Sequence, residues 1–263
     1  METLTSYPGY DGPFLASYDG AYDMAFAALH PFYTIPGHRP EDFAPWTLHM
    51  RRSELEEGLS GSQLLAAVDE VARDRRGGKL DPTLLDALAK QNGCRVGWER
   101  LGRDAGFSTL GAVNRALCTG IGGLHAEFSD PAGATRLEGY CNDKALFMPS
   151  EGRFQALMQH SIANLFHRAG VDAVEAAAEF DEIGQLLHPG ALAGDSPWTA
   201  EAGVPGRTSR LFAADRSVLV VVDWDSFFTL ICGRTERLER VPMTDLFDGF
   251  WCSATTSHSW WGD

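Results

Sequence analysis

The chain has 263 residues, of which 44% are hydrophobic and 11% aromatic, so it can bury a core and disorder is excluded. Its 36 acidic side chains outnumber 22 basic ones and give a formal net charge of −14, which repels phosphate backbones. No apolar run reaches the roughly 18 residues of a membrane span, and the first residues form no signal stretch, so we expect a cytoplasmic protein without a membrane partner.

The cysteines predict neither a disulfide framework nor a zinc site. Their number is odd and their gaps are wide and irregular, without the paired spacing of zinc ligands. We therefore expect buried free thiols. The five are Cys94, Cys118, Cys141, Cys232 and Cys252.

Residues 1–50 are rich in proline and aromatic side chains, which predicts an extended arm that wraps the body of the protein. One helix is expected to interrupt this arm, in the stretch DGAYDMAFAALH, where Pro31 would end it.

Residues 53–170 are predicted to be mainly helical. A capping box from Ser53 to Glu56 opens one amphipathic stretch, and Asp81 with the following proline opens another helix that ends near Gly93. The stretch SDPAGATRLEGYCN is read as a hinge. A further helix is expected in EGRFQALMQHSIANLFHRAG.

Residues 171–263 are predicted to form a sheet followed by a terminal helix. The segments SVLVVVD and SFFTLICG are rich in β-branched and aromatic residues and lie close together, which favours consecutive antiparallel strands. The stretch VDAVEAAAEFDE fits a short helix or a strand, and MTDLFDGFWCS fits a terminal helix. The fold class is therefore α+β, one domain with a helical body and a small, mainly antiparallel sheet toward the C-terminus.

Residues 98–121 have the pattern of a helix-turn-helix, with a turn at Gly106. The part GFSTLGAVNRAL resembles the second helix-turn-helix of arabinose-operon-type regulators. Of the residues facing outward on the second helix, only Asn114 and Arg115 suit the reading of a base, and local basic charge is small. We therefore expect a helical pair that supports the core and no nucleic-acid partner.

The histidines do not predict a metal site. His160 and His167 share a helix face but lie about 10 Å apart along its axis, too far to hold one ion together. We expect no bound metal and no cofactor, and the alternative is iron or manganese held by clustered acids.

The stretch DWDSFFT concentrates polar side chains between the two expected strands. Asp223 and Asp225 leave the first strand pointing the same way, while Ser226 and Thr229 enter the second. If AEFDE is a strand, its two acids repeat the arrangement and join them in a metal or amine site. The alternative is a simple turn built on aspartate side chains. The two further acids are Glu179 and Asp181.

The C-terminal stretch FDGFWCSATTSHSWW surrounds polar groups with aromatic rings, as a small-molecule pocket requires. Cys252 as nucleophile, with His258 as base and Asp248 orienting it, is one arrangement; tryptophans that seal the end of the core are the other. The predicted catalytic residues are Asp223, Asp225, His258 and Cys252, and the predicted substrate-binding residues are Ser226, Thr229, Trp251, Thr256 and Trp260.

The segments LHPFYTIP, GFSTLGAVNRAL, DWDSFFTLICG and DGFWCSATTSHSWW together resemble an uncharacterised bacterial family known only as a domain of unknown function. The resemblance implies one architecture, in which the helical turn belongs to the fold and is not a detachable module. It implies no activity, cofactor or catalytic residue.

The leading expectation is a small-molecule site, with an enzyme of unknown reaction as its first interpretation, where the DWDSFFT turn meets the aromatic C-terminus. Two alternatives stay open. The first is an acidic interaction or immunity-type protein that neutralises a basic protein partner through its net charge. The second is a DNA-binding regulator that uses residues 98–121.

Overall fold

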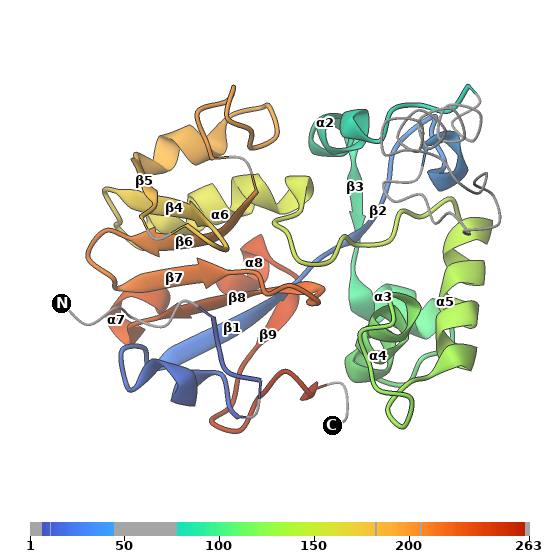
Figure 1. Cartoon of the computed structure of the whole chain (residues 1–263), viewed down its shortest axis with the longest axis horizontal. Coiled ribbons are helices and arrows are strands. Elements are labelled where there is room, and N and C mark those ends of the chain that lie inside the picture. Colours follow the sequence, from blue (N-terminus) through green and yellow to red (C-terminus); the bar gives the residue numbers. More distant parts are fainter. Residues whose placement is uncertain (1–6, 11, 45–77, 182, 206, 261–263) are drawn as a thin grey trace, which may run out of the picture.

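A computed structural model describes residues 7–10, 12–44, 78–181, 183–205 and 207–260 (Figure 1). Its centre is a seven-stranded sheet in the order β5-β4-β6-β7-β8-β1-β9, and every neighbouring pair is antiparallel. The strands are β1 (Met24–Leu29), β4 (Val174–Ala178), β5 (Gln185–Leu187), β6 (Thr208–Ala213), β7 (Val218–Val221), β8 (Phe228–Gly233) and β9 (Gly249–Trp251).

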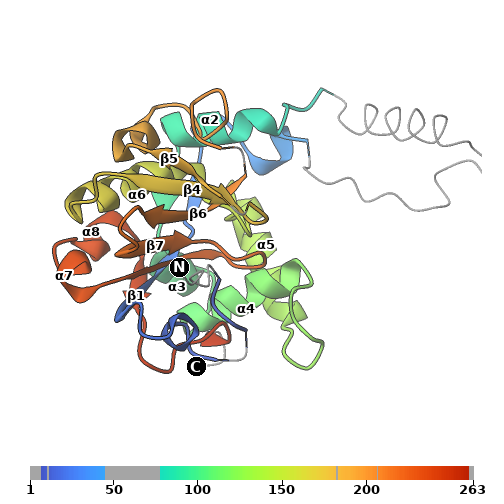
Figure 2. The ribbon, with the colours of Figure 1, turned by 60° about the vertical axis from the view of Figure 1, so that its left-hand side comes forward.

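Helices lie on both faces of the main sheet (Figure 2), and a second, two-stranded sheet lies to one side of it (Figure 1). The small sheet pairs β2 (Phe32–Thr34) with β3 (Cys94–Val96). The α-helices are α2 (Thr83–Asn92), α3 (Trp98–Asp104), α4 (Leu110–Gly120), α5 (Pro131–Asp143), α6 (Ala156–Arg168), α7 (Thr235–Leu238) and α8 (Met243–Leu246). Short 3-10 helices span Leu15–Tyr18, Pro40–Asp42 and Pro189–Ala193.

The main sheet is buried on both faces. On one face Ala25 and Ala27 of β1 pack in a core with Trp98 and other side chains of α3 and α4. On the opposite face Phe26 and Ala28 pack in a second core with α6, α7 and α8. All six residues of β8 are buried, because neither side of the strand faces water. The strands therefore read as apolar runs without alternation.

The expected fold, a helical body with a small sheet toward the C-terminus, is wrong. The sheet is large, and the N-terminal strand β1 is an inner strand paired with β8 and β9. The sequence MAFAAL favours a helix because alanine is a strong helix former, and a strand that is buried on both faces lacks the period of two that would reveal it. At the other end, the expected terminal helix stops at Leu246, and Gly249–Trp251 form an edge strand.

Other local predictions have mixed outcomes. The antiparallel pairing of SVLVVVD with SFFTLICG is confirmed by β7 and β8. The predicted helix forms and ends at Gly93, but it begins at Thr83 with Pro82 as its N-cap, and Asp81 accepts from the Thr83 N–H at 2.9 Å. The expected hinge is wrong: it is helix α5, which Asp130 caps by accepting from the Gly133 N–H. The capping box Ser53 to Glu56 lies outside the described residues.

Candidate functional site

The structure brings Asp223 and His258 together. Asp223 follows β7, and His258 lies in the C-terminal segment; their Oδ2 and Nε2 atoms are 3.5 Å apart. Neither of these buried atoms has a hydrogen-bond partner among the described residues. The imidazole stacks on Tyr10 at 4.8 Å and meets the edge of Phe14 at 5.0 Å. We call these four residues the terminal clasp, because they join both ends of the chain to the β7–β8 turn.

The clasp favours a neutral imidazole. Burial lowers the pKa of His258, while the negative charge of Asp223 and a hydrogen bond to the Pro8 backbone oppose this effect. Tyr10 donates to the other Asp223 oxygen at 3.3 Å, and burial together with Asp223 raises the pKa of Tyr10 to about 12. Since the facing atoms of the pair are out of solvent, the arrangement holds the termini and offers a substrate no access in this conformation.

The remaining side chains of the DWDSFFT stretch separate. Asp225 is exposed, and its pKa is raised by burial of part of the carboxyl and by the charge of Asp223. Ser226 is buried and donates to the Asp223 carbonyl at 2.8 Å, so its hydroxyl closes the turn. Asp223 also accepts from the Trp224 N–H at 2.8 Å. The backbone closes the turn, because the Ser226 N–H donates to the Asp223 carbonyl at 3.1 Å.

Thr229 lies in the core beside a histidine that the sequence did not place. His30 is fully buried, with Nδ1 2.9 Å from the Ser150 carbonyl and Nε2 3.0 Å from the Thr229 hydroxyl. Because a carbonyl only accepts, Nδ1 carries the proton, and Nε2 accepts from Thr229. Burial lowers the pKa of His30 to about 4. This pair is a satisfied structural contact inside the sheet.

The aromatic C-terminus does not assemble the proposed cysteine triad. Asp248 accepts from the Trp98 N–H at 2.7 Å, and no contact joins Cys252 to His258 in the described structure. Burial raises the pKa of Cys252 to about 12, so this thiol stays protonated at neutral pH.

The other C-terminal candidates take structural positions. Trp260 is buried against Phe250 at 5.1 Å between ring centroids, and so seals the end of the core. Trp251 is half-exposed on the edge strand β9 and packs on Phe26. The Thr256 hydroxyl accepts from the backbone of its own turn at 2.9 Å.

Trp224 of the DWDSFFT turn lines two cavities, of which one is much the larger. The larger cavity has a volume of about 730 Å³ and is walled by four aromatic residues, Phe154, Phe180, Trp198 and Trp224, which define what we call the aromatic groove. The rings of Phe154 and Trp198 contact each other at 5.5 Å, whereas Phe180 is 87% exposed and Trp224 is 64% exposed. Two rings thus form a packed wall, and two are free to cover a ligand.

A smaller cavity continues the groove toward the terminal clasp. Its volume is about 210 Å³, and Tyr7 and Glu151 line it together with four residues that it shares with the groove. Tyr7 is fixed by a 2.7 Å hydrogen bond between its hydroxyl and that of Ser209. The shared residues are Gly152, Glu179, Ser209 and Trp224.

The groove contains more acidic than basic side chains. Asp86 and Arg153 form an ion pair, so their opposite charges largely cancel. Of the other charged residues described in its lining, Glu179 and Glu201 are acidic and Arg207 is basic. In the adjoining cavity, burial and the neighbouring Asp225 raise the pKa of Glu151.

The four carboxylates that the sequence grouped divide between two roles. Glu179 lines the groove, and the negative charges of Asp223, Asp225 and Glu179 all raise the pKa of Tyr10. Asp181 instead accepts from the Ala178 N–H at 2.8 Å and closes the turn after β4. Among the described residues no group of three or more histidine, cysteine and acidic side chains has the geometry to hold a metal.

Sequence reasoning missed most of the groove. Its aromatic walls come from the start of α6, the turn after β4, the loop before β6 and the β7–β8 turn, four segments that spacing along the chain does not connect. One local signal was present in the sequence. Trp224 lies between Asp223 and Asp225, and a polar turn does not need a large aromatic side chain, so this tryptophan indicates a role in binding.

The helix-turn-helix candidate forms as two helices, with Gly106 in the left-handed region at φ 77°. Asn114, one of the two residues suited to base reading, is buried. Arg115, the other, donates to the carbonyl of Phe128. Both side chains thus take part in packing the pair against its neighbours.

These features define a protein with a large antiparallel sheet between two helical layers and an acidic, aromatic groove at one end of the sheet. The family model for a protein of unknown function, DUF2711, matches residues 10–261, so the chain belongs to this family. No curated protein and no solved structure matched the chain. None of the described helices is both long and apolar enough to cross a membrane.

Proposed function

We propose that this protein binds a small organic cation in the aromatic groove. The observation that carries the proposal is a 730 Å³ cavity that combines the exposed rings of Phe180 and Trp224 with Glu179 and Glu201. Aromatic faces and carboxylates both stabilise an ammonium group, and the volume suits a small molecule. The net charge of −14 raises the local concentration of cations.

The catalytic interpretation of the site is a narrower proposal. The terminal clasp holds a buried acid and imidazole next to the groove, but a reaction through it requires the clasp to open. Binding is therefore the step that we propose first, and catalysis on the bound amine would follow from it.

The proposal is tested with matched fragments and matched variants. Benzylamine and benzyl alcohol are titrated by NMR; we expect the cation to bind at about millimolar Kd and the alcohol to bind several-fold more weakly, since a cation–π contact contributes about 0.5–2 kcal/mol. Trp224→Leu and Glu179→Gln should each weaken the binding of benzylamine. Trp251→Leu and Glu236→Gln, which alter residues outside the groove, are the controls. Equal binding of amine and alcohol would refute a site for cations.

A second candidate function is binding of a basic protein, which one observation favours. Ile183 is 86% exposed and Leu186 is 64% exposed, beside the open edge of the sheet at β5 and the acidic Asp181. Exposed apolar side chains rimmed by acids suit a basic, partly apolar surface. Lysozyme serves as a basic probe. The double variant Ile183→Ser with Leu186→Ser should reduce its salt-sensitive binding, and Leu84→Ser, at an exposed leucine elsewhere, should not.

A further inference from the structure

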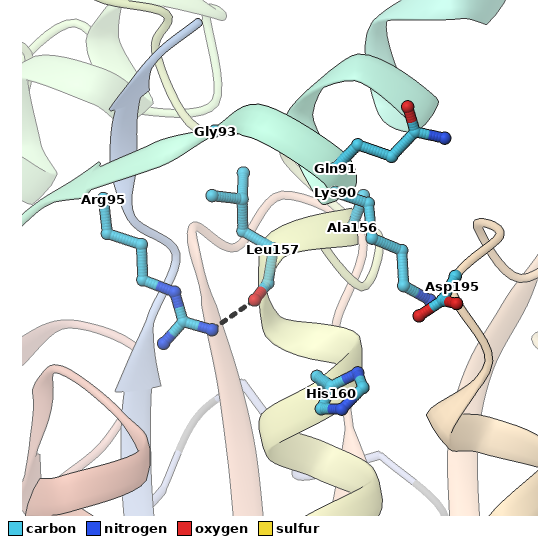
Figure 3. A pocket seen from close by; sticks show the side chains of 8 residues that line it. All are labelled: Lys90, Gln91, Gly93, Arg95, Ala156, Leu157, His160 and Asp195. Atoms are coloured by element: carbon cyan, nitrogen blue, oxygen red, sulfur yellow. Dashed lines mark hydrogen bonds between the residues drawn. The ribbon is translucent and has the colours of Figure 1, made fainter.

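A second cavity, of about 610 Å³, lies beside the first turn of α6 and shares no lining residue with the aromatic groove (Figure 3). Arg95 of β3 and Lys90 of α2 reach toward α6 from its two sides, and His160 lies between them on the helix. Asp195 is the one acidic residue among the described residues that line it. The lining thus carries two basic side chains, Lys90 and Arg95, besides His160 and against one acidic side chain.

Lys90 is held in this cavity by neutral oxygens. Its ammonium group donates to the Gln159 side-chain oxygen at 2.9 Å and to the Ser196 carbonyl at 2.7 Å. Burial lowers the pKa of Lys90, and Asp195 opposes this without forming an ion pair. Two of the three ammonium protons are used, and one is left for a ligand.

Arg95 is also held by neutral acceptors. Its guanidinium donates to the carbonyl of Leu157, to that of Leu246 at 3.2 Å and to the Ser161 hydroxyl at 3.1 Å. The contacts fix the side chain across the start of α6. They also leave its positive charge without a carboxylate partner in the part of the chain that the structure describes.

Two cations without ion pairs in one cavity are unexpected in a chain with 36 acidic and 22 basic side chains. A structural role alone would be met by pairing them with any of the abundant carboxylates, as Arg153 pairs with Asp86. A cation without an ion pair in a partly desolvated cavity retains its capacity to bind an external anion.

We infer that the cavity between Lys90, Arg95 and His160 binds a small, multiply charged oxyanion of the phosphate type. Lysine supplies a point charge, arginine a planar set of donors, and His160, which is exposed and has no hydrogen-bond partner among the described residues, an additional donor. The backbone at the start of α6 adds the positive end of a 13-residue helix. The volume accommodates a diphosphate group with a small organic part.

The inference is tested with inorganic pyrophosphate on the whole protein at constant ionic strength. Calorimetry should give a Kd of about 1 mM or tighter, and the ring signals of His160, assigned by their loss in His160→Gln, should shift on titration. Lys90→Met should weaken binding about tenfold or more, because a hydrogen bond to a charged group is lost. Lys144→Met, the same change at an exposed lysine outside the cavity, should bind as the unaltered protein does.

Absence of binding at several times the expected Kd, or shifts of other histidines without those of His160, would overturn the inference. Unaltered affinity in Lys90→Met would do the same. If Lys90→Met fails to fold, His160→Gln decides the matter, since His160 is exposed and its replacement should weaken binding several-fold while leaving the thermal midpoint unchanged. The aromatic groove is not involved, so neither result depends on the binding of cations there.

Discussion

The buried imidazole of His30 makes the stability of this protein sensitive to acid. In the folded state its pKa is lowered to about 4 by burial, whereas in the unfolded chain it is near 6.5. The unfolded state therefore binds the proton first as the pH falls. Stability from this group is complete above about pH 6.5 and is lost progressively down to about pH 4.

The size of this loss of stability follows from the difference between the pKa of His30 in the folded and in the unfolded state. A change of one pKa unit corresponds to about 1.4 kcal/mol, so acidification from pH 7 to pH 4 should remove about 3 kcal/mol from the free energy of unfolding through His30 alone. His258, whose pKa is also lowered by burial, acts in the same direction. Asp225 and Glu151 act in the opposite direction, because their raised pKa values favour protonation of the folded state.

The assay is urea unfolding at several pH values between 7 and 4, for the unaltered protein and for His30→Gln. The variant lacks the titrating ring, and all other groups are common to both proteins. We expect the unaltered protein to lose about 3 kcal/mol more than the variant over this range. Parallel curves for the two proteins would show that His30 does not titrate with a lowered pKa, and the reasoning would be refuted.

Three further outcomes are expected. Gly152→Ala should destabilise the protein by about 1–2 kcal/mol or more and alter Trp224 fluorescence, because φ is +62° and a Cβ would collide with the Trp224 carbonyl; an unchanged urea midpoint would contradict this. Asp223→Asn should lower the pKa of His258, measured by NMR, since the Asp223 carboxylate raises this pKa; an unchanged or higher pKa would show that the carboxylate and the imidazole do not interact. Cys252 should react with iodoacetamide at pH 8 far more slowly than free cysteine, because burial holds its pKa at about 12.

The strands that the sequence predicts correctly are those with β-branched side chains. β7 and β8 contain valine, isoleucine, phenylalanine and threonine, and a polar turn separates them. β1 is not predicted as a strand because three of its six residues are alanine and because its partner strands, β8 and β9, lie far away in the sequence. Local propensity carries no information on such distant pairing.

The candidate sites also depend on contacts between distant residues, which the local sequence does not reveal. Asp223 and His258 were grouped from their chemistry, and the structure brings them within 3.5 Å. Cys252 was grouped with them through proximity in sequence, yet the backbone of Cys252 continues from β9 and hydrogen-bonds to Ala25, which directs the residue elsewhere. The aromatic groove and the cavity beside α6 consist of residues from several elements, and only the tertiary fold determines which of them meet.

The position of β1 between β8 and β9 also constrains the order in which the chain can fold during synthesis. Met24 pairs with Gly233, and Phe26 pairs with Trp251, so these contacts join residues 209 and 225 positions apart. When the ribosome has made the first half of the protein, β1 has no strand to pair with and exposes an apolar segment. The central sheet can close only after residues 228–233 and 249–251 have been synthesised, so β1 remains an unpaired apolar segment for a long interval of translation.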